Sequence, residues 1–433
     1  MPKKNLTIEE TFSLAVKNHQ KNNLQIAANL YKETLKVNPD HIDANNNLGL
    51  IFGALGEFQK AIDCYEKAIQ INPNYASVRN NLGLVFEKFK EDNKAISCYE
   101  KAIQINPYYA VAHFNLGNVL KKLGKFQEAK KSYQKAIQIR PGLAAAHNNL
   151  GDLLSDLGER KKAKSCYEKA IQINPNFTNA YWNLHSCASD IDEVLIILKK
   201  LYKIDSKFLK ARIMISALQG FKGNFDDFNA LVASSDFKHP YMRSIKWVFS
   251  LPKLPKIYFN RWDFFDAVVA LVDKSRTFYE FGVWNGTSFQ YLINTLERGF
   301  GFDTFTGLPE DWHYDHAGTY SSFGSVPKIE GGKFIVGKFE DTLPKFFSKK
   351  RPLASLINFD ADLYSSTLCA LNYSNKVIDE KSILIFDEFL MSEHWEQDEY
   401  RALNEFCDNS NTTYEVIAVS FFSKQVAVRL KKN

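Results

Sequence analysis

Small and aromatic residues return with a period of 34 residues along the first half of the chain, between residues 8 and 211. A repeat of this length predicts a solenoid of paired helices, in which each unit buries its apolar face against its neighbours. Small residues let the two helices of a unit approach closely, and a proline after the second helix stops that helix. The recurring positions are Gly49, Gly83, Gly117 and Gly151, then Pro39, Pro73, Pro107, Pro141 and Pro175, and finally Tyr31, Tyr65, Tyr99, Tyr133 and Tyr167.

This pattern is identified as that of the tetratricopeptide (TPR) repeat. Five units are clear, and a sixth over residues 178–211 keeps the first helix but loses the glycine and the proline. A degenerate unit is expected where a solenoid ends or meets another domain. The sequence therefore predicts a TPR repeat array over residues 1–211.

Beyond residue 277 the period changes, and short apolar runs alternate with helical stretches. Such alternation predicts a mostly parallel sheet with helices on both faces, that is, an α/β Rossmann-like domain over residues 256–433. The last two runs are only a few residues apart, which favours an antiparallel hairpin at one edge. The predicted strands are 278–283, 299–305, 333–336, 354–359, 382–386, 414–420 and 425–430. Residues 212–255 form a helical linker, with the helix-breaking LPKLP at 251–255 as its hinge.

Several of these strands end in an acidic residue, at the edge where open parallel sheets bind ligands. The first is followed by a glycine-bracketed turn, FYEFGVWNGTS, in which Glu280, Gly282 and Gly286 precede a helix that begins near Thr287. Glycine lets the backbone approach a ligand closely, and the helix start offers unpaired N–H groups. Asp303 ends the second strand, 23 residues after Glu280. It is placed to accept hydrogen bonds from ribose hydroxyls, or else to cap a helix or turn.

This glycine turn resembles the first cofactor motif of class I S-adenosylmethionine-dependent methyltransferases. The words GFDTFTGLPEDW, GKFEDTLP, FDADLYSST and FDEF, in this order, resemble the macrocin O-methyltransferase (TylF-like) family. That resemblance runs from Phe278 to the C terminus and implies a seven-strand methyltransferase domain that methylates a sugar hydroxyl. It implies S-adenosylmethionine as the cofactor, contacted by Glu280, Gly282, Gly286, Ser288 and Asp303.

Four carboxylates gather at two neighbouring strand ends: Asp360, Asp362, Asp387 and Glu388. They repel one another unless a cation or substrate hydroxyls come between them, and oxygen ligands favour an ion such as Mg²⁺. Alternatively, Asp362 caps the helix that begins near Tyr364 and Glu388 is solvated. The family resemblance implies that magnesium is held by Asp360, Asp387 and Glu388, although the family's third ligand is an aspartate.

The stretch from Thr306 to Gly332 lacks a helical period, and a loop of this length inside a domain is usually functional or disordered. It contains His313 and His316, and His394 follows the fifth predicted strand. Histidine can act as a general base near neutral pH. We therefore take Asp362, His313 and His394 as candidates for the base that removes the proton of an acceptor hydroxyl.

One asparagine recurs on the first helix of five units: Asn47, Asn81, Asn115, Asn149 and Asn183. In a TPR superhelix this helix lines the concave surface, where amides can hold an extended peptide because each has a donor and an acceptor. A similar ladder occurs in the TPR array of the O-linked N-acetylglucosamine transferase family. The alternative is that these asparagines pack neighbouring helices together.

The charge is uneven: residues 1–250 carry 35 − 24 = +11 and residues 251–433 carry 20 − 25 = −5. A basic solenoid favours an acidic protein or glycan partner. Its lysines lack the concentrated Arg/aromatic patch of nucleic-acid binders, so no nucleic-acid partner is expected. The first ten residues lack the apolar core of a secretory signal, and Thr7 with Glu10 predicts a helix capping box. We expect a cytoplasmic protein without a membrane span.

Three functions remain open at this stage. The first is methyl transfer to a hydroxyl, most readily of a sugar or glycan, with the repeats recruiting a partner or substrate. The second is a TPR scaffold whose methyltransferase-like half is catalytically degenerate. The third is methylation of a protein that the repeats bind. The acceptor, the metal requirement, the TPR partner and the oligomeric state are not specified by the sequence.

Overall fold

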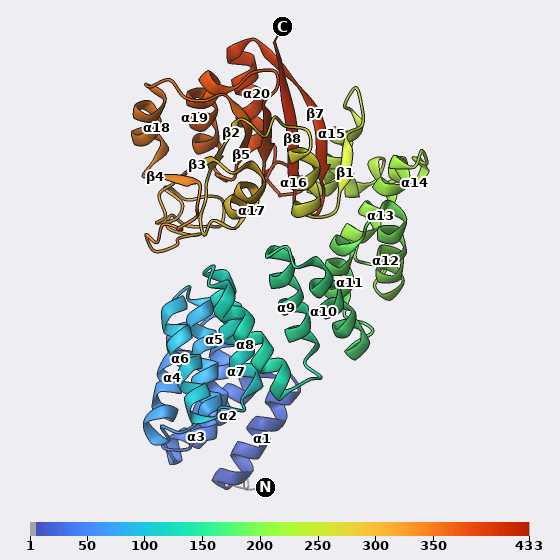
Figure 1. Cartoon of the computed structure of the whole chain (residues 1–433). Coiled ribbons are helices and arrows are strands. Elements are labelled where there is room, and N and C mark those ends of the chain that lie inside the picture. The colour runs from blue at the N-terminus through green and yellow to red at the C-terminus, as the bar shows by residue number, and fades with distance from the viewer. Residues whose placement is uncertain (1–5, 433) are drawn as a thin grey trace. The chain divides into compact units, whose positions relative to one another are not determined.

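The computed structural model describes residues 6–432, and the chain divides into two compact units, Met1–Leu153 and Leu154–Asn433. The first unit consists of helices arranged as successive pairs (Figure 1). Its helices are α1 (Ile8–Gln20), α2 (Leu24–Val37), α3 (Ile42–Ala54), α4 (Phe58–Ile71), α5 (Ala76–Lys88), α6 (Asp92–Ile105), α7 (Ala110–Lys122), α8 (Phe126–Ile139) and α9 (Ala144–Asp156), which runs into the second unit. The predicted helical solenoid is confirmed.

The recurring glycine and tyrosine contact each other in the repeats that contain Gly49, Gly83 and Gly117. A Cβ atom on Gly83 of α5 would lie 2.6 Å from a ring carbon of Tyr99 on α6, and Gly117 faces Tyr133 at 2.7 Å. Any larger side chain would push the two helices apart, because the tyrosine rings are fully buried. The 34-residue period of these glycines and tyrosines thus reflects a helix-to-helix contact that recurs from one of these repeats to the next. The capping box at the start of α1 is also confirmed, with the Thr7 hydroxyl accepting from the Glu10 N–H at 3.1 Å.

The second unit begins with the remaining repeat helices and the linker. They are α10 (Arg160–Ile173), α11 (Thr178–Leu184), η1 (His185–Cys187), α12 (Ile191–Ile204), α13 (Leu209–Phe221), α14 (Asp226–Val232), η2 (Ser235–Lys238) and α15 (Pro240–Phe249). The first helix of the degenerate repeat, α11, has only 7 residues and passes directly into a 3₁₀ turn. The linker is helical, as the sequence predicts.

The rest of the second unit is a mixed sheet with helices. Its elements are β1 (Lys256–Tyr258), α16 (Arg261–Val269), β2 (Thr277–Phe281), α17 (Thr287–Leu296), β3 (Gly299–Asp303), β4 (Gly332–Val336), α18 (Phe339–Phe347), β5 (Ala354–Phe359), α19 (Tyr364–Ser374), η3 (Asn375–Val377), β6 (Ile383–Phe386), α20 (Glu399–Ser410), β7 (Thr412–Ser420) and β8 (Gln425–Lys432). Within the described residues the strands form one 8-stranded sheet in the order β1-β7-β8-β6-β5-β2-β3-β4.

All of the predicted strands are present, and β7 and β8 form the predicted antiparallel hairpin. The hairpin is not at the edge, however, because the short strand β1 pairs in parallel with β7 outside it. The sequence analysis missed β1, since its three residues directly follow the helix-breaking prolines. Four other pairs of neighbouring strands are parallel: β2–β3, β2–β5, β3–β4 and β5–β6.

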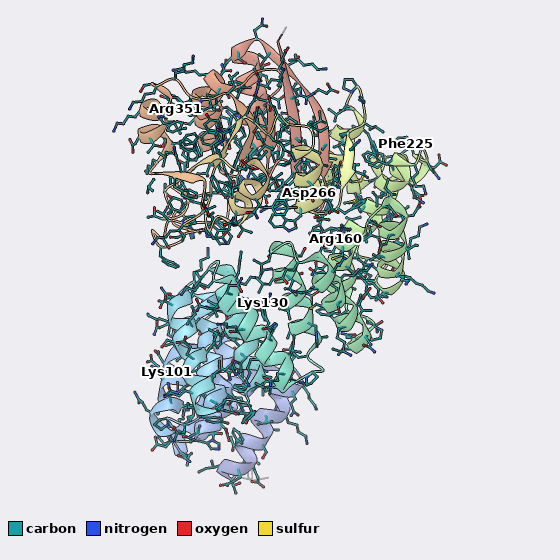
Figure 2. All side chains as sticks on the ribbon, in the orientation of Figure 1. Lys101, Lys130, Arg160, Phe225, Asp266 and Arg351 are labelled. Carbon is teal, nitrogen blue, oxygen red and sulfur yellow. The ribbon has the colours of Figure 1, made fainter. Side chains whose placement is uncertain are left out.

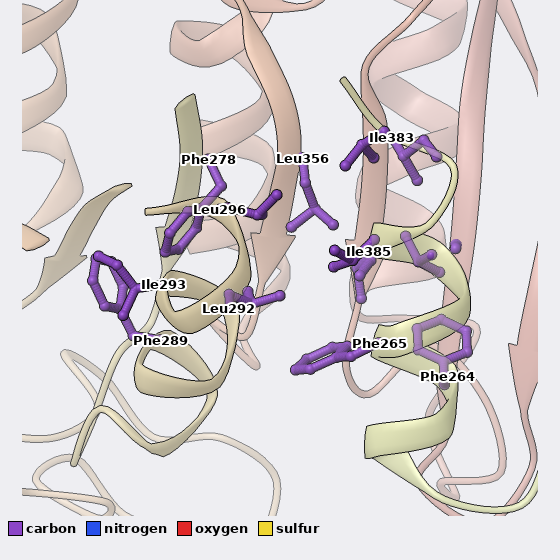
Figure 3. Close-up of a cluster of buried hydrophobic side chains, with 14 of the residues drawn as sticks. Phe264, Phe265, Phe278, Phe289, Leu292, Ile293, Leu296, Leu356, Ile383 and Ile385 are labelled. Atoms are coloured by element: carbon purple, nitrogen blue, oxygen red, sulfur yellow. The ribbon is translucent and has the colours of Figure 1, made fainter. Parts of the chain in front are cut away.

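Helices α16 and α17 cover one face of this sheet. Figure 3 shows Phe265 of α16 and Leu292 of α17 beside Leu356 of β5 and Ile385 of β6, all within one buried cluster. Burial of each such side chain contributes about 1.5–3 kcal/mol relative to exposure. This cluster fixes the start of α16 and the start of α17 close to the sheet.

A row of four phenylalanines crosses the other face of the parallel strands. Phe302 of β3 lies 4.8 Å from Phe281 of β2, measured between ring centroids, and Phe281 lies 5.4 Å from Phe359 of β5. Phe359 is 4.9 Å from Phe386 of β6, with the rings within 9° of parallel. The same residues are partners in the strand register. Their stacking therefore favours one alignment of four strands, and we call them the phenylalanine row.

The last repeats pack against the sheet domain within the second unit. Arg160 of α10, labelled in Figure 2, donates to the Asp263 carboxylate at 2.6 Å and to the carbonyl of Cys187 at 2.9 Å. The indole of Trp262 donates to the carbonyl of Ser155 at 2.6 Å. Packing thus groups residues 154–211 with the sheet, whereas the repeat pattern groups them with the solenoid.

Across residues 6–432, no helix combines the length and the apolar character needed to cross a membrane.

We predict that Phe359→Ala lowers the free energy of unfolding of the second unit by about 3–5 kcal/mol, because it leaves a cavity in the middle of the phenylalanine row. Urea unfolding followed by intrinsic fluorescence measures this. Phe323→Ala is the matched control, since Phe323 is 61% exposed and its loss should change the value by less than about 0.5 kcal/mol. Equal effects of the two substitutions would contradict the role of the row.

Candidate functional site

The carboxyl ends of the parallel strands are held side by side by backbone hydrogen bonds that extend beyond the strands. The Gly282 N–H donates to the Phe302 carbonyl at 2.9 Å, the Asp360 N–H to the Phe281 carbonyl at 2.8 Å, and the Asp387 N–H to the Phe359 carbonyl at 3.1 Å. Because side chains alternate along a strand, the residue after each phenylalanine points to the opposite face, where α16 and α17 lie. The sequence prediction that acidic strand ends meet at one edge is confirmed.

The glycine turn after β2 has the tight backbone that the motif predicts. Gly282 has φ +87°, and a Cβ there would lie 1.8 Å from the Asp360 carbonyl oxygen. Gly286 has φ +80° and is the N-cap of α17. Both residues have the positive φ that favours glycine, and at Gly282 a side chain would also collide with the backbone of Asp360. The side chains of Pro327 and Ile329 lie against Gly286, so the long loop after β3 covers this part of the turn.

Glu280 is fully buried beneath the turn. The Ser288 hydroxyl on α17 donates to its Oε1 at 2.5 Å, while its Oε2 has no hydrogen-bond partner. Burial raises the pKa of Glu280 to about 8, against smaller opposing effects of the Ser288 hydrogen bond and the Arg261 charge. Glu280 and Ser288 were predicted as cofactor contacts, and the structure brings these two together.

The Asp303 carboxylate accepts hydrogen bonds from three backbone N–H groups of the protein. Its Oδ2 accepts from the N–H groups of Val283 and Trp284, both at 2.7 Å, and its Oδ1 accepts from the Phe305 N–H at 2.6 Å. Asp303 therefore fixes the glycine turn and the turn after β3, which is the turn role that the sequence left open. A contact with ribose hydroxyls stays a prediction.

Two asparagines at this end of the sheet have buried polar atoms without well-aligned hydrogen bonds. Asn358 of β5 is the partner of Glu280 in the strand register and is fully buried, and its amide is near enough to lower the pKa of Glu280 without making a well-aligned hydrogen bond to it. The amide nitrogen of Asn285 in the glycine turn is also unpaired. A buried polar group without a partner costs free energy, so these atoms fit a site that a polar ligand completes.

Two of the predicted metal ligands are paired with basic side chains. Asp387 Oδ2 is 2.5 Å from Arg261 Nη2, and its Oδ1 accepts from Gln425 Nε2 at 2.5 Å. Lys424 Nζ contacts both oxygens of Glu388, at 3.0 and 2.7 Å. We call these five residues the paired-carboxylate cluster. Burial alone lowers the pKa of Arg261, but the nearby carboxylates, Asp387 and then Asp360, raise it above its ordinary value.

This arrangement does not fit a magnesium ion. Magnesium needs several free oxygen ligands in octahedral geometry, and here two of the three expected carboxylates already face fixed cations. Across residues 6–432, no three His, Cys, Asp or Glu side chains lie in a group that could hold a metal.

Three further acids lie close to this cluster. Burial, and then the charge of Asp387, raises the pKa of Asp360 well above its ordinary value. Burial and the charge of Glu388 do the same for Asp362. The N-cap of α19 is Leu363, without a side-chain hydrogen bond, so Asp362 is not the helix cap that was its alternative role. Burial, and then the charge of Asp387, also raises the pKa of Glu399, a residue that the sequence analysis did not single out.

The three histidines of the second half separate into two groups. The His313 Nε2 lies 2.9 Å from Asp398 Oδ2, and its ring stacks on that of His394 with centroids 4.2 Å apart. The Trp312 indole donates to the same aspartate at 3.3 Å. His316 instead is 70% exposed beside Asp311. The candidate bases His313 and His394 are therefore brought together, and Asp398 holds the loop of residues 306–332 to the segment after β6.

The predicted ladder asparagines hydrogen-bond to side chains of the preceding repeat rather than to one another. Asn81 Nδ2 donates to Asn46 Oδ1 at 3.0 Å, and Asn115 Nδ2 donates to Asn80 Oδ1 at 3.0 Å. Each bond joins one repeat to the preceding one, as do the remaining ladder contacts, in which Asn47 donates to Tyr31 (3.3 Å) and Asn149 donates to Asn118 (2.8 Å). Asn183 lies at the same register in α11. These contacts match the packing role, while peptide binding by the ladder stays a prediction.

Several site residues were not predicted from the sequence, because they lie outside the recognisable motifs. Arg261 precedes β2, and Lys424 and Gln425 lie at the β7–β8 turn, far from the motifs in sequence. Asn358 could have been noticed, since it is a polar residue inside the apolar run of β5. Asp398 lies four residues after His394, in a segment with many acidic residues.

Comparison with known families identifies the repeats. The family models described as tetratricopeptide repeat match residues 42–75 and 108–176, and a model described as TPR repeat matches residues 90–124. The chain therefore contains TPR repeats in its N-terminal region. No curated protein matches the chain.

Solved structures similar to this chain include two that are described as TPR proteins. MamA is 27% identical, with 37% of this chain and 94% of MamA covered and a TM-score of 0.35. PilF of Pseudomonas aeruginosa is 21% identical, with 50% and 96% covered and a TM-score of 0.43. YrrB, a TPR protein with an unusual peptide-binding site, is 20% identical, with 44% and 97% covered and a TM-score of 0.35. Each of these three TM-scores is below 0.5.

We predict that Glu280 makes the second unit less stable as the pH rises. Its pKa is raised from 4.5 to about 8, so the folded state holds a proton that the unfolded state releases. The stability from this group is complete below pH 4.5 and is lost as the pH rises through about 8. Unfolding free energies of Glu280→Gln should fall less between pH 5 and 8 than those of the wild type.

The control is Glu380→Gln, which neutralises an exposed glutamate in the same unit. Its urea-unfolding curves should keep the pH dependence of the wild type. If Glu280→Gln also keeps that dependence, the carboxyl of Glu280 does not titrate as its surroundings predict.

Proposed function

We propose that the second unit binds S-adenosylmethionine and transfers its methyl group to an acceptor hydroxyl, and that the TPR repeats recruit the protein partner or the substrate. The observation that carries this proposal is the glycine turn between β2 and α17, with Glu280 and Asn358 buried beneath it and partly unpaired. A sugar or glycan is the acceptor class that the resemblance to macrocin O-methyltransferases favours.

The residues at the strand ends support a nucleoside-binding role. The turn presents backbone to the edge of a parallel sheet, which is where such sheets bind ligands. Unpaired donors and acceptors on Asn285, Asn358 and Glu280 leave hydrogen-bonding capacity for the polar groups of the cofactor. Asp303 would then act twice, by holding the turn through two backbone N–H groups and by accepting from ribose with its remaining lone pairs.

The bound cofactor would supply an electrophilic methyl group on sulfur. The chain must then align the acceptor oxygen and remove its proton, and alignment alone supplies about 7–11 kcal/mol in the best cases. His313 is our first candidate for the base, because Asp398 orients its ring. Asp362 is a second candidate, being buried with a raised pKa.

The TPR repeats support a protein-binding role more directly, since the family models match there. Solenoid repeats present extended surfaces for partners. A scaffold whose second unit binds ligand without catalysis is therefore the rival proposal, and methylation of a TPR-bound protein is a third. They differ in whether the cofactor binds and whether its methyl group is transferred.

Calorimetric titration of S-adenosylmethionine into the full chain tests the cofactor. We expect binding to the wild type, weakened about tenfold or more by Asp303→Asn, because a hydrogen bond to a charged group contributes about 1.5–3 kcal/mol. Asp341→Asn is the control, as it neutralises an exposed carboxylate in the first turn of α18. Absence of heat with folded wild-type protein would favour the scaffold, and an unchanged affinity of Asp303→Asn would remove Asp303 from the site.

Affinity capture with mass spectrometry tests the repeats. Leu50 and Leu84 are apolar, 38% and 40% exposed, and lie one repeat apart on the first helices α3 and α5. Replacing both with glutamate should remove partners from the captured set without unfolding the array. Ile26→Glu on the second helix α2, 53% exposed, should leave the set unchanged. An identical set from all three proteins would argue against binding by the first helices.

A further inference from the structure

The start of α16 places a guanidinium among the strand-end carboxylates. Asn260 caps this helix by accepting from the Asp263 N–H at 2.8 Å, and its amide donates to the Ser186 carbonyl at 3.2 Å. The helix start is thereby fixed, and Arg261 is its first residue. Its side chain is 32% exposed and meets an Asp387 side chain that is 7% exposed.

The β7–β8 turn contributes a second cation and an amide from the other direction. Lys424 contacts both oxygens of Glu388, and Gln425, which is fully buried, donates to Asp387. Both oxygens of each carboxylate thus have a donor from a side chain that is itself held in place. An ion entering this cluster would meet two fixed positive charges within hydrogen-bond distance of its ligands, and like charges that close repel strongly.

We propose that Arg261 and Lys424 replace a divalent ion at the paired-carboxylate cluster, so that the site is a metal-independent one with built-in positive charge. Asp360, Asp387 and Glu388 form no metal-binding group as they stand, so removing both positive side chains should let these three carboxylates rotate to share a divalent cation. The replacement of the ion is inferred from the contacts of Arg261 with Asp387 and of Lys424 with Glu388. Its consequence for catalysis, that an acceptor hydroxyl is held by the guanidinium and the carboxylates, rests on the proposed function.

The test uses Mn²⁺ as the probe, because it accepts the same oxygen ligands as magnesium and is detected by its paramagnetic resonance signal. The full-length wild type should not bind it, with chelator or added Mn²⁺ leaving thermal unfolding unchanged. The double variant Arg261→Met with Lys424→Met keeps the apolar stems and removes both charges. It should bind Mn²⁺ at least about tenfold more tightly than the wild type, because the repulsion is gone.

Two further variants identify the site. Adding Asp387→Asn to the double variant should abolish Mn²⁺ binding. The matched control, Arg276→Met with Lys431→Met, removes an arginine paired with Asp379 and a lysine paired with Glu415, and should behave like the wild type. Thermal unfolding with and without Mn²⁺ gives a second readout, since binding to the folded state raises the transition temperature even of a weakened variant.

The proposal is overturned if the wild type binds Mn²⁺ and loses it with Asp387→Asn, or if the folded double variant binds none. Titrating S-adenosylmethionine into the same proteins separates this result from the proposed function. Failure of the cofactor to bind would refute methyl transfer and leave the Mn²⁺ result standing. Cofactor binding together with Mn²⁺ binding by the wild type would refute only the charge replacement.

Discussion

The stacking of four phenylalanines across β3, β2, β5 and β6 is the constraint on which the candidate site depends. A parallel sheet has evenly spaced hydrogen bonds, and a slip of one residue would turn every side chain to the wrong face. Because the rings lie 4.8 to 5.4 Å apart and are buried, only one alignment lets all four stack. In that alignment Asp303, Gly282, Asp360 and Asp387 each follow a phenylalanine and share the opposite face. The phenylalanine row on one face of the sheet thus sets the positions of the strand-end residues on the other face.

Electrostatic balance at the strand ends comes from residues that are remote in sequence. Arg261 and Asp387 are 126 positions apart, and Lys424 and Glu388 are 36 apart. Buried carboxylates are tolerated only when paired, hydrogen-bonded or protonated. Here Asp387 and Glu388 are paired, whereas burial and neighbouring charge raise the pKa values of Asp360, Asp362 and Glu399. Helix α16, the β7–β8 turn and the loop after β6 therefore have to fold together before any of these acids is stable in place.

The sequence predicted what depends on local periodicity. The repeat helices, the strands and the glycine turn all follow from spacing, because packing of helix on helix or strand on strand repeats at fixed intervals. It did not predict β1, whose pairing with β7 is a tertiary contact of three residues. Nor did it predict that Asp387 faces Arg261 or that the Asn81 amide bonds to Asn46, because the partner of a polar side chain depends on three-dimensional neighbours. Asp303 is an intermediate case: its position at the strand end was predicted, whereas its bonds to the Val283 and Trp284 amides were not.

The anchoring of Arg160 has a consequence for how such a chain could be shortened or recombined. Its guanidinium donates both to the carbonyl of Cys187 and to the carboxylate of Asp263, close to the capped start of α16. One side chain therefore joins a repeat to the sheet domain. Exchange of the whole solenoid at residue 211 would sever that link and expose the indole of Trp262, whose partner is Ser155. A fusion point near residue 153, where the compact units meet, would retain both contacts. The terminal repeats thus form one packed unit with the sheet. A new recognition module would therefore replace only the repeats that precede residue 153.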